Sequence, residues 1–191
     1  MRIRYNAPTV LSFAFASVAV LILSQAVYQP LTVEWFAVPG RENFSPGNIR
    51  HLISIFTHVL GHANWSHLVS NFTIILLIGP MLEEIYGSLS LFTMILITTV
   101  VTGLLHVFFF PSTLLGASGV VFMMILLASF TNFNRGEVPL TFILVLILYL
   151  GMEFFYSFGD VPAGTDNISH FSHVVGGFIG SLFGFFRVKR R

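Results

Sequence analysis

Cysteine is absent from this chain of 191 residues. Without a thiol the protein forms no disulfide and offers no thiolate as a nucleophile or metal ligand, so those kinds of chemistry are excluded. The absence leaves open which redox compartment the protein occupies.

Charged residues are also scarce, since they make up 9% of the chain against about 25% in a typical soluble domain. Hydrophobic residues make up 55%, and the mean hydropathy is +0.86. The longest mostly polar stretch, residues 29–48, does not form a soluble domain. We therefore expect an all-α integral membrane protein with a single domain, residues 1–191. The net charge of +1 gives no sign of a nucleic-acid partner.

Long apolar runs alternate with short turns along the chain. A helix needs about 20 apolar residues to cross a hydrocarbon core about 30 Å thick. The predicted spans are residues 9–28, 65–86, 89–110, 118–133, 140–158 and 168–186, of which the fourth is conspicuously short. The alternative for the first run is a cleaved signal peptide, although the run is long for one. Residues 29–64 hold only short apolar pieces, so we expect a connection that is partly embedded in the membrane.

Lysine and arginine lie mostly on one side of this six-span arrangement. Six spans place both termini on the same side, together with Arg135, and leave only Arg41 and Arg50 on the other. Because cytoplasmic loops are enriched in lysine and arginine, the termini are predicted to be cytoplasmic. The long connection and the turn before Ser118 then face outward.

Few polar groups interrupt the spans, and such groups usually mark a function because they are costly to bury in lipid. They are His67, Asn71, His106, Ser118, Glu153 and His173, with His170 near the end of a span. Four of them lie in the outward halves of their spans: His67, Asn71, Ser118 and His173. We expect these four to meet in one pocket that water reaches from outside. His106 and Glu153 have no predicted role.

His173 is followed by a row of glycines on the last predicted span. These glycines share one helical face with it, at intervals of three, four, seven and eleven residues: Gly176, Gly177, Gly180 and Gly184. Glycines let membrane helices pack with their backbones close together, so this face brings His173 toward a neighbouring helix. A histidine must come within about 3 Å of a serine hydroxyl to act as its base. The alternative is a packing seam with an incidental histidine.

His67 and Asn71 are four residues apart and share one face of the second span. With the backbone N–H of Ser118 and the positive end of the helix that starts there, they could stabilise an oxyanion. The alternative is a polar pair that only bonds one helix to another. A metal site is the rival explanation for the histidines. We expect no metal, because no His-Glu-x-x-His motif occurs and no carboxylate shares these faces.

The serine turn and the glycine face together resemble the rhomboid family of intramembrane serine proteases. Gly116-Ala117-Ser118-Gly119 is similar to the family's Gly-x-Ser-Gly turn. His173 with Gly176 and Gly180 is similar to its His-x-x-Gly-x-x-x-Gly motif.

The second span resembles the same family in two further places. His67 and Asn71 match its His-x-x-x-Asn motif, and His62 matches a histidine five residues earlier. The end of the span carries further matching residues: Gly79, Glu83, Gly87 and Ser88. The matching positions extend over residues 57–184.

The resemblance implies a six-helix rhomboid-like bundle and a serine endopeptidase that cleaves transmembrane segments near the outer leaflet. Ser118 would be the nucleophile and His173 the general base, in a dyad without a carboxylate. His67, Asn71 and the Ser118 amide would line the oxyanion hole. No metal or cofactor is implied, the partners would be transmembrane substrates and the lipid bilayer, and the location would be a prokaryotic plasma membrane. The oligomeric state is not indicated.

Two features depart from the family pattern. Members often carry a tyrosine four residues after the serine, where it stacks on the histidine. Phe122 stands there instead, which keeps the ring and loses the hydroxyl, so we expect stacking and activity to survive. The Trp-Arg pair common in the family's first loop is absent at its usual spacing, and Arg50 lies displaced toward the N-terminus.

Two other kinds of protein fit parts of the pattern. One is a non-catalytic rhomboid-like protein that binds client helices and thins the membrane around them, although such relatives typically lack the serine or the histidine. The other is a small channel or transporter that conducts through the polar pocket. The chain has no inverted repeat and no paired broken helices, which argues against a transporter.

Overall fold

The computed structural model describes residues 5–130, 140, 143–144, 147–148 and 170–188, with residues 170–173 and 187–188 described in their backbone only. The fifth predicted span, with Glu153 and the loops on either side of it, therefore lies largely outside the described residues. The helices are α1 (Pro8–Ala26), α2 (Leu31–Trp35), α3 (Ile49–Thr57), the 3-10 turn η1 (His58–Leu60), α4 (Trp65–Tyr86), α5 (Ser88–Phe109), α6 (Ser118–Ser129) and α8 (His170–Val188).

Three of the described helices, α1, α4 and α5, are long and apolar enough to cross a membrane. The second predicted span coincides with α4, and the first and third agree with α1 and α5 within two residues at each end. The fourth predicted span runs to residue 133, whereas α6 ends at Ser129. α8, described over His170–Val188, overlaps the sixth predicted span.

Helix boundaries follow from local chemistry. α1 begins at Pro8. Proline lacks a backbone N–H, and this costs nothing in the first turn, where an N–H would have no partner within the helix. The Asn64 side chain accepts a hydrogen bond from the His67 backbone N–H at 2.8 Å and so caps α4. α4 ends at Gly87, which has φ of +82° and ψ of 150°, a conformation that favours glycine. The chain can therefore reverse there and start α5 at the next residue.

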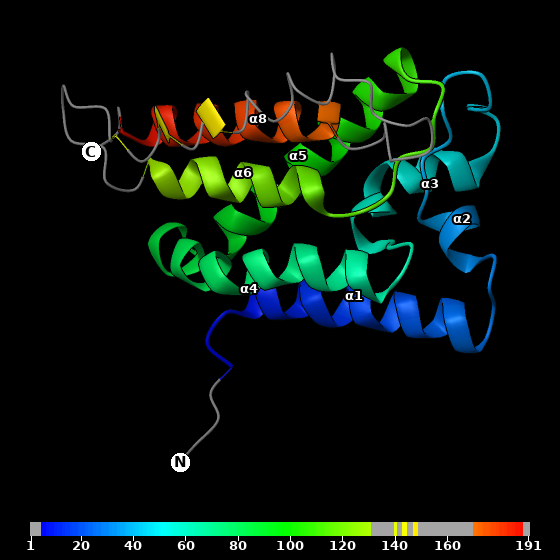
Figure 1. Ribbon diagram of the computed structural model, residues 1–191, viewed down its shortest axis with the longest axis horizontal. Helices are drawn as coiled ribbons and strands as arrows, with labels where there is room; N and C mark the ends of the chain where they lie inside the picture. Colours follow the sequence, from blue (N-terminus) through cyan, green and yellow to red (C-terminus); the bar gives the residue numbers. More distant parts are fainter. Residues whose placement is uncertain (1–4, 131–139, 141–142, 145–146, 149–169, 189–191) are drawn as a thin grey trace.

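Figure 1 shows α1, α4, α6 and α8 stacked in that order, with α5 crossing them obliquely. α2 and α3 lie at one end of the stack, which we call the α2–α3 end. α4, α6 and α8 all begin at this end and run parallel to one another, whereas α1 runs in the opposite direction (Figure 1). The residues that begin α4, α6 and α8 are thereby gathered at one end of the bundle.

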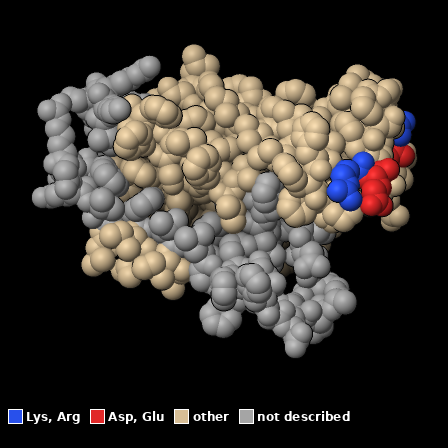
Figure 2. Space-filling view, turned by 90° about the horizontal axis from the view of Figure 1, so that it is seen from above, with Lys and Arg blue, Asp and Glu red and all other residues tan. Residues whose placement is uncertain are grey.

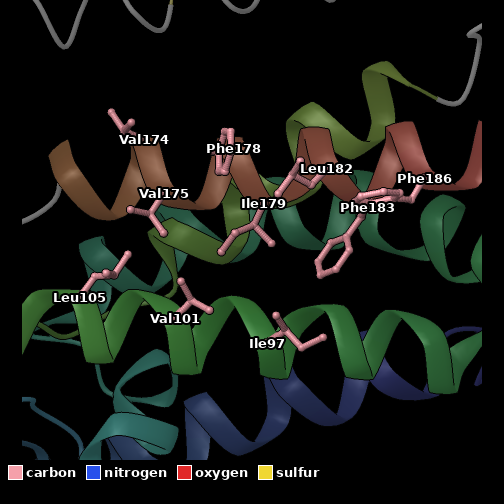
Figure 3. Close-up of a pocket in the computed structure, with 10 residues that line it drawn as sticks. All are labelled: Ile97, Val101, Leu105, Val174, Val175, Phe178, Ile179, Leu182, Phe183 and Phe186. Atoms are coloured by element: carbon pink, nitrogen blue, oxygen red, sulfur yellow. The ribbon is translucent and has the colours of Figure 1, made fainter.

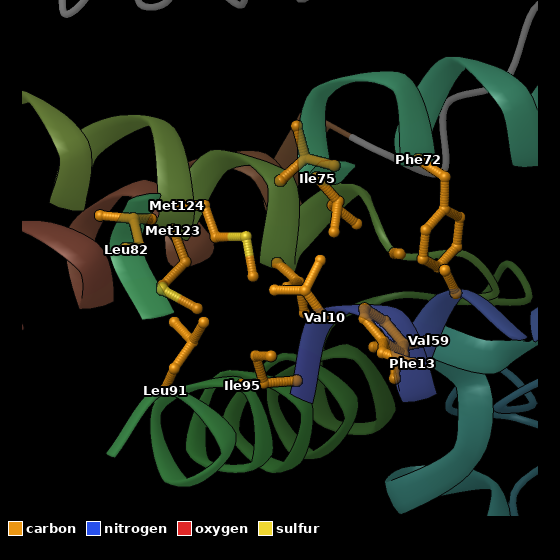
Figure 4. Packing of buried hydrophobic residues seen from close by; sticks show 14 of the residues in the cluster. Val10, Phe13, Val59, Phe72, Ile75, Leu82, Leu91, Ile95, Met123 and Met124 are labelled. Carbon is orange, nitrogen blue, oxygen red and sulfur yellow. The ribbon is translucent and has the colours of Figure 1, made fainter. Parts of the chain in front are cut away.

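α6 is the central helix of the described bundle, and it packs most extensively against α8. Met123 and Met124 point from it into the core and are fully buried. Figure 4 shows side chains from three other helices in the same buried cluster: Val10 from α1, Ile75 and Leu82 from α4, and Leu91 and Ile95 from α5. Methionine's flexible, polarizable side chain suits it to filling such irregular space.

Glu83 joins the start of α1 to the end of α4. Its two carboxylate oxygens accept hydrogen bonds from the backbone N–H groups of Thr9 at 2.8 Å and Val10 at 3.0 Å. The Thr9 hydroxyl also donates to the Ser88 carbonyl at 3.0 Å. The carboxylate thus satisfies free N–H groups at the positive end of α1. We interpret Glu83 as a structural residue that holds α1 to α4 at the end of the bundle opposite α2 and α3.

The connection between α1 and α4 is more ordered than its sequence predicts, because it holds α2, α3 and η1. Arg50 bonds Glu34 at 2.6 Å and lies 5.2 Å from the centroid of the Trp35 ring. Trp35 and Arg50 are therefore neighbours in the structure, although their spacing in the sequence is not the usual one of the family. Charged side chains gather at this end of the molecule, while most of the described surface in Figure 2 carries none.

Candidate active site

Ser118 is the first residue of α6 and is partly buried. The link between α5 and α6, residues 110–117, brings the chain back into the bundle and ends in a turn at Gly116, whose φ is +110°. The Gly116 N–H donates to the His58 carbonyl oxygen at 2.9 Å. Ser118 therefore sits where a helix presents free N–H groups and the positive end of its dipole.

His67 and Asn71 lie directly beside this turn. A methyl group added at Gly116 would be 2.7 Å from both Cε1 and Nε2 of His67 and 3.8 Å from Nδ2 of Asn71. The first turns of α4 and the approach to Ser118 are thus in van der Waals contact. The absence of a side chain at position 116 is what permits this contact.

Asn71 and His62 each bury a polar nitrogen that has no hydrogen-bond partner within the described part of the chain, namely Nδ2 of Asn71 and Nε2 of His62. Such groups are rare, because leaving one unpaired costs about 1–3 kcal/mol. Asn71 therefore keeps an N–H donor beside the turn that precedes Ser118. Nε2 of His62 is an acceptor instead, because Nδ1 of the neutral ring donates to the Leu60 carbonyl oxygen at 3.3 Å.

The His62 ring packs edge-on against the His67 ring, with 5.0 Å between the ring centroids, and 5.7 Å from the ring of Phe72. Burial, and then the neighbouring His67, lower the pKa of His62 to about 4. His62 is consequently neutral at pH 7, and its ring supports His67 without adding a charge to the site.

α8 meets α6 through its glycine face. A side chain at Gly176 would collide with the carbonyl oxygen of Gly119, and one at Gly180 with that of Met123. Both pairs are four residues apart on each helix, so the two helices run in step. His173 lies in α8 one turn before Gly176, level with the turn that precedes Ser118. The His173 side chain is outside what the structure describes.

The remaining predicted residues divide between this site and the opposite end of the bundle. Phe122 is partly exposed and follows Ser118 by one turn of α6. Gly79 lets α1 approach α4, since a side chain there would come within 2.8 Å of Val10. Glu83 and Gly87 lie at the far end of α4, away from Ser118, so their contribution is to the fold.

Sequence reasoning missed the groups that hold the 110–117 link. His58 is buried, and its Nε2 lies 3.4 Å from the Thr102 hydroxyl of α5. His106, also buried, has its Nε2 2.8 Å from the Ser112 carbonyl oxygen. The only sequence signal was a histidine inside an apolar span, which pointed to His106 without showing its partner.

A groove of about 490 Å³ lies between α5 and α8, away from Ser118. Figure 3 shows its lining, which is entirely apolar: Ile97, Val101, Leu105, Val174, Val175, Phe178, Ile179, Leu182, Phe183 and Phe186. None of the described residues in its lining is polar or titratable, so they offer nothing for acid–base or nucleophilic chemistry. Across the described residues, no group of three or more His, Asp or Glu side chains converges on a metal position.

Comparison with known families decides how this chain is classified. A family model described as the Rhomboid domain matches residues 50–190 of the chain. The chain belongs to the rhomboid family. The prediction of family membership from the serine, histidine and glycine motifs is thereby confirmed, and the apolar helices agree with a membrane protein of that family.

Two rhomboid relatives show how far the similarity extends. Rhomboid-related protein 1 of Caenorhabditis elegans is 30% identical over 156 residues, which cover 77% of this chain and 43% of that protein. Rhomboid protease GlpG of Haemophilus influenzae is 24% identical over 138 residues, which cover 71% of this chain and 69% of that protein. The chain thus spans less than half the length of the first relative and about two thirds of the second.

Proposed function

We propose that this rhomboid chain is a serine endopeptidase that cleaves transmembrane segments of other proteins by a Ser118–His173 dyad. The name of the Haemophilus relative, a rhomboid protease, supports this class of activity. The proposal includes six spans with cytoplasmic termini, a plasma-membrane location and cleavage near the outer leaflet. It is based on the fold and on the groups around Ser118.

The observation that carries the proposal is the backbone contact between α6 and α8. Because the two helices run in step and touch at Gly176, the histidine one turn earlier is level with the serine turn. Glycine packing removes the side-chain layer that would keep an imidazole out of reach of a hydroxyl. We therefore expect the His173 imidazole to come within hydrogen-bond distance of the Ser118 hydroxyl.

The surroundings of Ser118 support a role for His67 and Asn71 in the oxyanion hole. Both contact the turn that leads to the serine, and Asn71 has a buried amide nitrogen without a described partner. Acyl transfer needs donors aimed at the position of the developing oxyanion. The backbone N–H of Ser118, at the positive end of α6, supplies a third donor.

In the proposed reaction the Ser118 oxygen attacks a substrate peptide carbonyl while His173 takes the hydroxyl proton. The tetrahedral oxyanion is stabilised by His67, Asn71 and the Ser118 N–H. When the intermediate collapses, the peptide C–N bond breaks and His173 gives the proton to the leaving amine. Water then attacks the acyl-enzyme with His173 again as base, which releases the acid and restores the serine.

The test is labelling of the purified full chain with a fluorophosphonate, together with cleavage of a model transmembrane substrate. Ser118→Ala and His173→Ala should each abolish both signals. Ser129→Ala is a matched control, because its hydroxyl belongs to the same helix and only donates to the Ile125 carbonyl. His51→Ala controls for loss of a histidine away from the site.

Labelling that persists in Ser118→Ala would show that another residue is the nucleophile. If the wild type binds the model substrate but is neither labelled nor cleaves it, the protein is a client-binding rhomboid relative and the enzymatic proposal is wrong.

A further inference from the structure

The 110–117 link that leads to Ser118 is fastened along its length by groups outside the proposed dyad and oxyanion hole. Val38 and Leu114 exchange two backbone hydrogen bonds, at 2.8 and 2.9 Å. The Arg41 N–H donates to the Phe110 carbonyl oxygen at 2.7 Å. These bonds, with the one from Gly116 to His58, tie the link to the connection between α1 and α4.

His106 ties the same link to α5. It lies in the last turn of that helix, is 1% exposed, and its Nε2 is 2.8 Å from the Ser112 carbonyl oxygen. A carbonyl oxygen only accepts hydrogen bonds, so Nε2 must carry the proton and donate. The ring also stacks on Phe110, with 5.6 Å between centroids and 15° between planes. Both contacts hold the ring in one orientation.

We propose that His106 is a positioning residue for the nucleophile: its Nε2–H···O bond to Ser112 sets the course of the link and so the position of the Ser118 hydroxyl. The inference rests on the proposed function, because it assigns His106 a task in that reaction. His106 does not touch the reacting atoms. It acts through the five residues between Ser112 and Ser118.

The physical reason is the sensitivity of nucleophilic attack to geometry. A displacement of about 1 Å in a reacting group can cost about a hundredfold in rate. A side chain without a donor at position 106 would leave the partly buried Ser112 carbonyl without this bond, and the link would relax toward another partner. The attacking oxygen would then be misplaced while substrate binding is kept, so kcat should fall with little change in KM.

The experiment compares the rate of fluorophosphonate labelling and the steady-state constants of purified full-length variants. His106→Phe keeps a flat ring and loses the donor, and it should slow labelling and lower kcat between about tenfold and a hundredfold. His106→Gln keeps an N–H donor of similar reach and should stay close to the wild type. Thr99→Val is the matched control, since Thr99 is a buried hydroxyl of α5 that bonds only within its helix at Ile95.

Hydrogen exchange separates failure of this inference from failure of the proposed function. In His106→Phe the amides of residues 112–116 should exchange faster than in the wild type, whether or not the protein is a protease. If the wild type is not labelled but His106→Phe shows this faster exchange, the proposed protease activity is wrong, while the His106–Ser112 bond is still shown to hold the link. A folded His106→Phe with wild-type labelling and exchange would overturn the inference.

A measurement on the wild type decides the matter if His106→Phe does not fold. The nitrogen NMR signals of the His106 ring, assigned by their loss in His106→Gln, should show a proton on Nε2. A proton on Nδ1 alone would rule out donation to Ser112 and overturn the inference.

Discussion

Gly116 and Gly87 both have a positive φ, but only Gly116 has another side chain close to where its own would be. Gly116 has φ of +110° and would place a methyl group 2.7 Å from the His67 ring, whereas Gly87 has φ of +82° and open space around it. We predict that Gly87→Ala costs about 1–3 kcal/mol of stability through backbone strain alone. Gly116→Ala should lose more stability and also activity, because the His67 ring has to move.

Thermal unfolding and substrate cleavage of the two variants in the same detergent measure this difference. If Gly116→Ala loses no more stability than Gly87→Ala and still cleaves the substrate, the contact with His67 does not matter for activity.

Nδ2 of Asn71 is buried without a partner among the described residues, so the proposed function predicts that loss of Asn71 affects activity more than stability. We predict that Asn71→Leu lowers kcat by about a hundredfold, as for loss of one oxyanion donor. Its free energy of unfolding should stay within about 1 kcal/mol of the wild type, because no described hydrogen bond of Nδ2 is lost.

Asn48→Ala is the contrasting asparagine variant. Asn48 caps α3 by accepting the Arg50 N–H at 3.0 Å, so its loss should cost about 1 kcal/mol and leave kcat unchanged. Both variants can be measured by unfolding and cleavage assays, and an Asn71→Leu protein with normal kcat would remove Asn71 from the oxyanion hole.

The short motifs predicted which residues would lie near the start of α6, while the catalytic roles given to them stay predictions. Gly116, Ser118, His67 and Asn71 stand at helical or turn spacings that can be read directly. The role of His106 could not be predicted, because its acceptor is a backbone carbonyl in an irregular link. Backbone partners of this kind leave no trace in residue type.

At the scale of helices, Glu83 is the clearest single fastener. Its carboxylate accepts two backbone N–H groups of α1, and Glu84 beside it is exposed. We predict that Glu83→Ala lowers the free energy of unfolding by about 2 kcal/mol or more, since bonds to a charged group are strong and the N–H groups would be left unpaired.

Glu84→Ala should change that free energy by less than about 0.5 kcal/mol. Unfolding of both variants in detergent is the measurement, and equal stability of the two would show that the carboxylate does not hold α1 to α4.

The apolar runs predicted the helices well and their ends less well. α4 matched the prediction because Asn64 and Gly87 are strong boundary signals at both ends. The end of α6 was predicted too far along the chain because Phe130 and Phe133 extend the apolar pattern past Ser129. α2 and α3 were not predicted, since five and nine residues are too few to show a clear period. The meeting of Arg50 with Trp35 depends on how these short helices fold back.

For the whole molecule, two buried histidines link stability to pH. Burial lowers the pKa of His58 and of His62 from 6.5 to about 4, and both lie outside the spanning helices. Between pH 6.5 and 4 the unfolded chain binds protons that the folded chain does not. Stability should therefore be level above about pH 6.5, fall as the pH drops toward about 4, and change little below that.

Each histidine can contribute up to about 3 kcal/mol over this range. Thermal unfolding between pH 7.5 and 4.5 measures the slope, and His62→Gln should reduce it. A wild-type slope that is absent, or that rises toward acid, would contradict the prediction.

The glycine face between α6 and α8 has a mechanical consequence. Two helices whose main chains touch share no compressible layer, and tightly packed interfaces shift between discrete arrangements instead of deforming gradually. α6 and α8 should therefore move together as one rigid body in any conformational change of the protein. If the proposed function holds, an opening that admits a substrate helix from the lipid would be made by other helices, and the Ser118 hydroxyl and His173 imidazole would keep their alignment through every turnover.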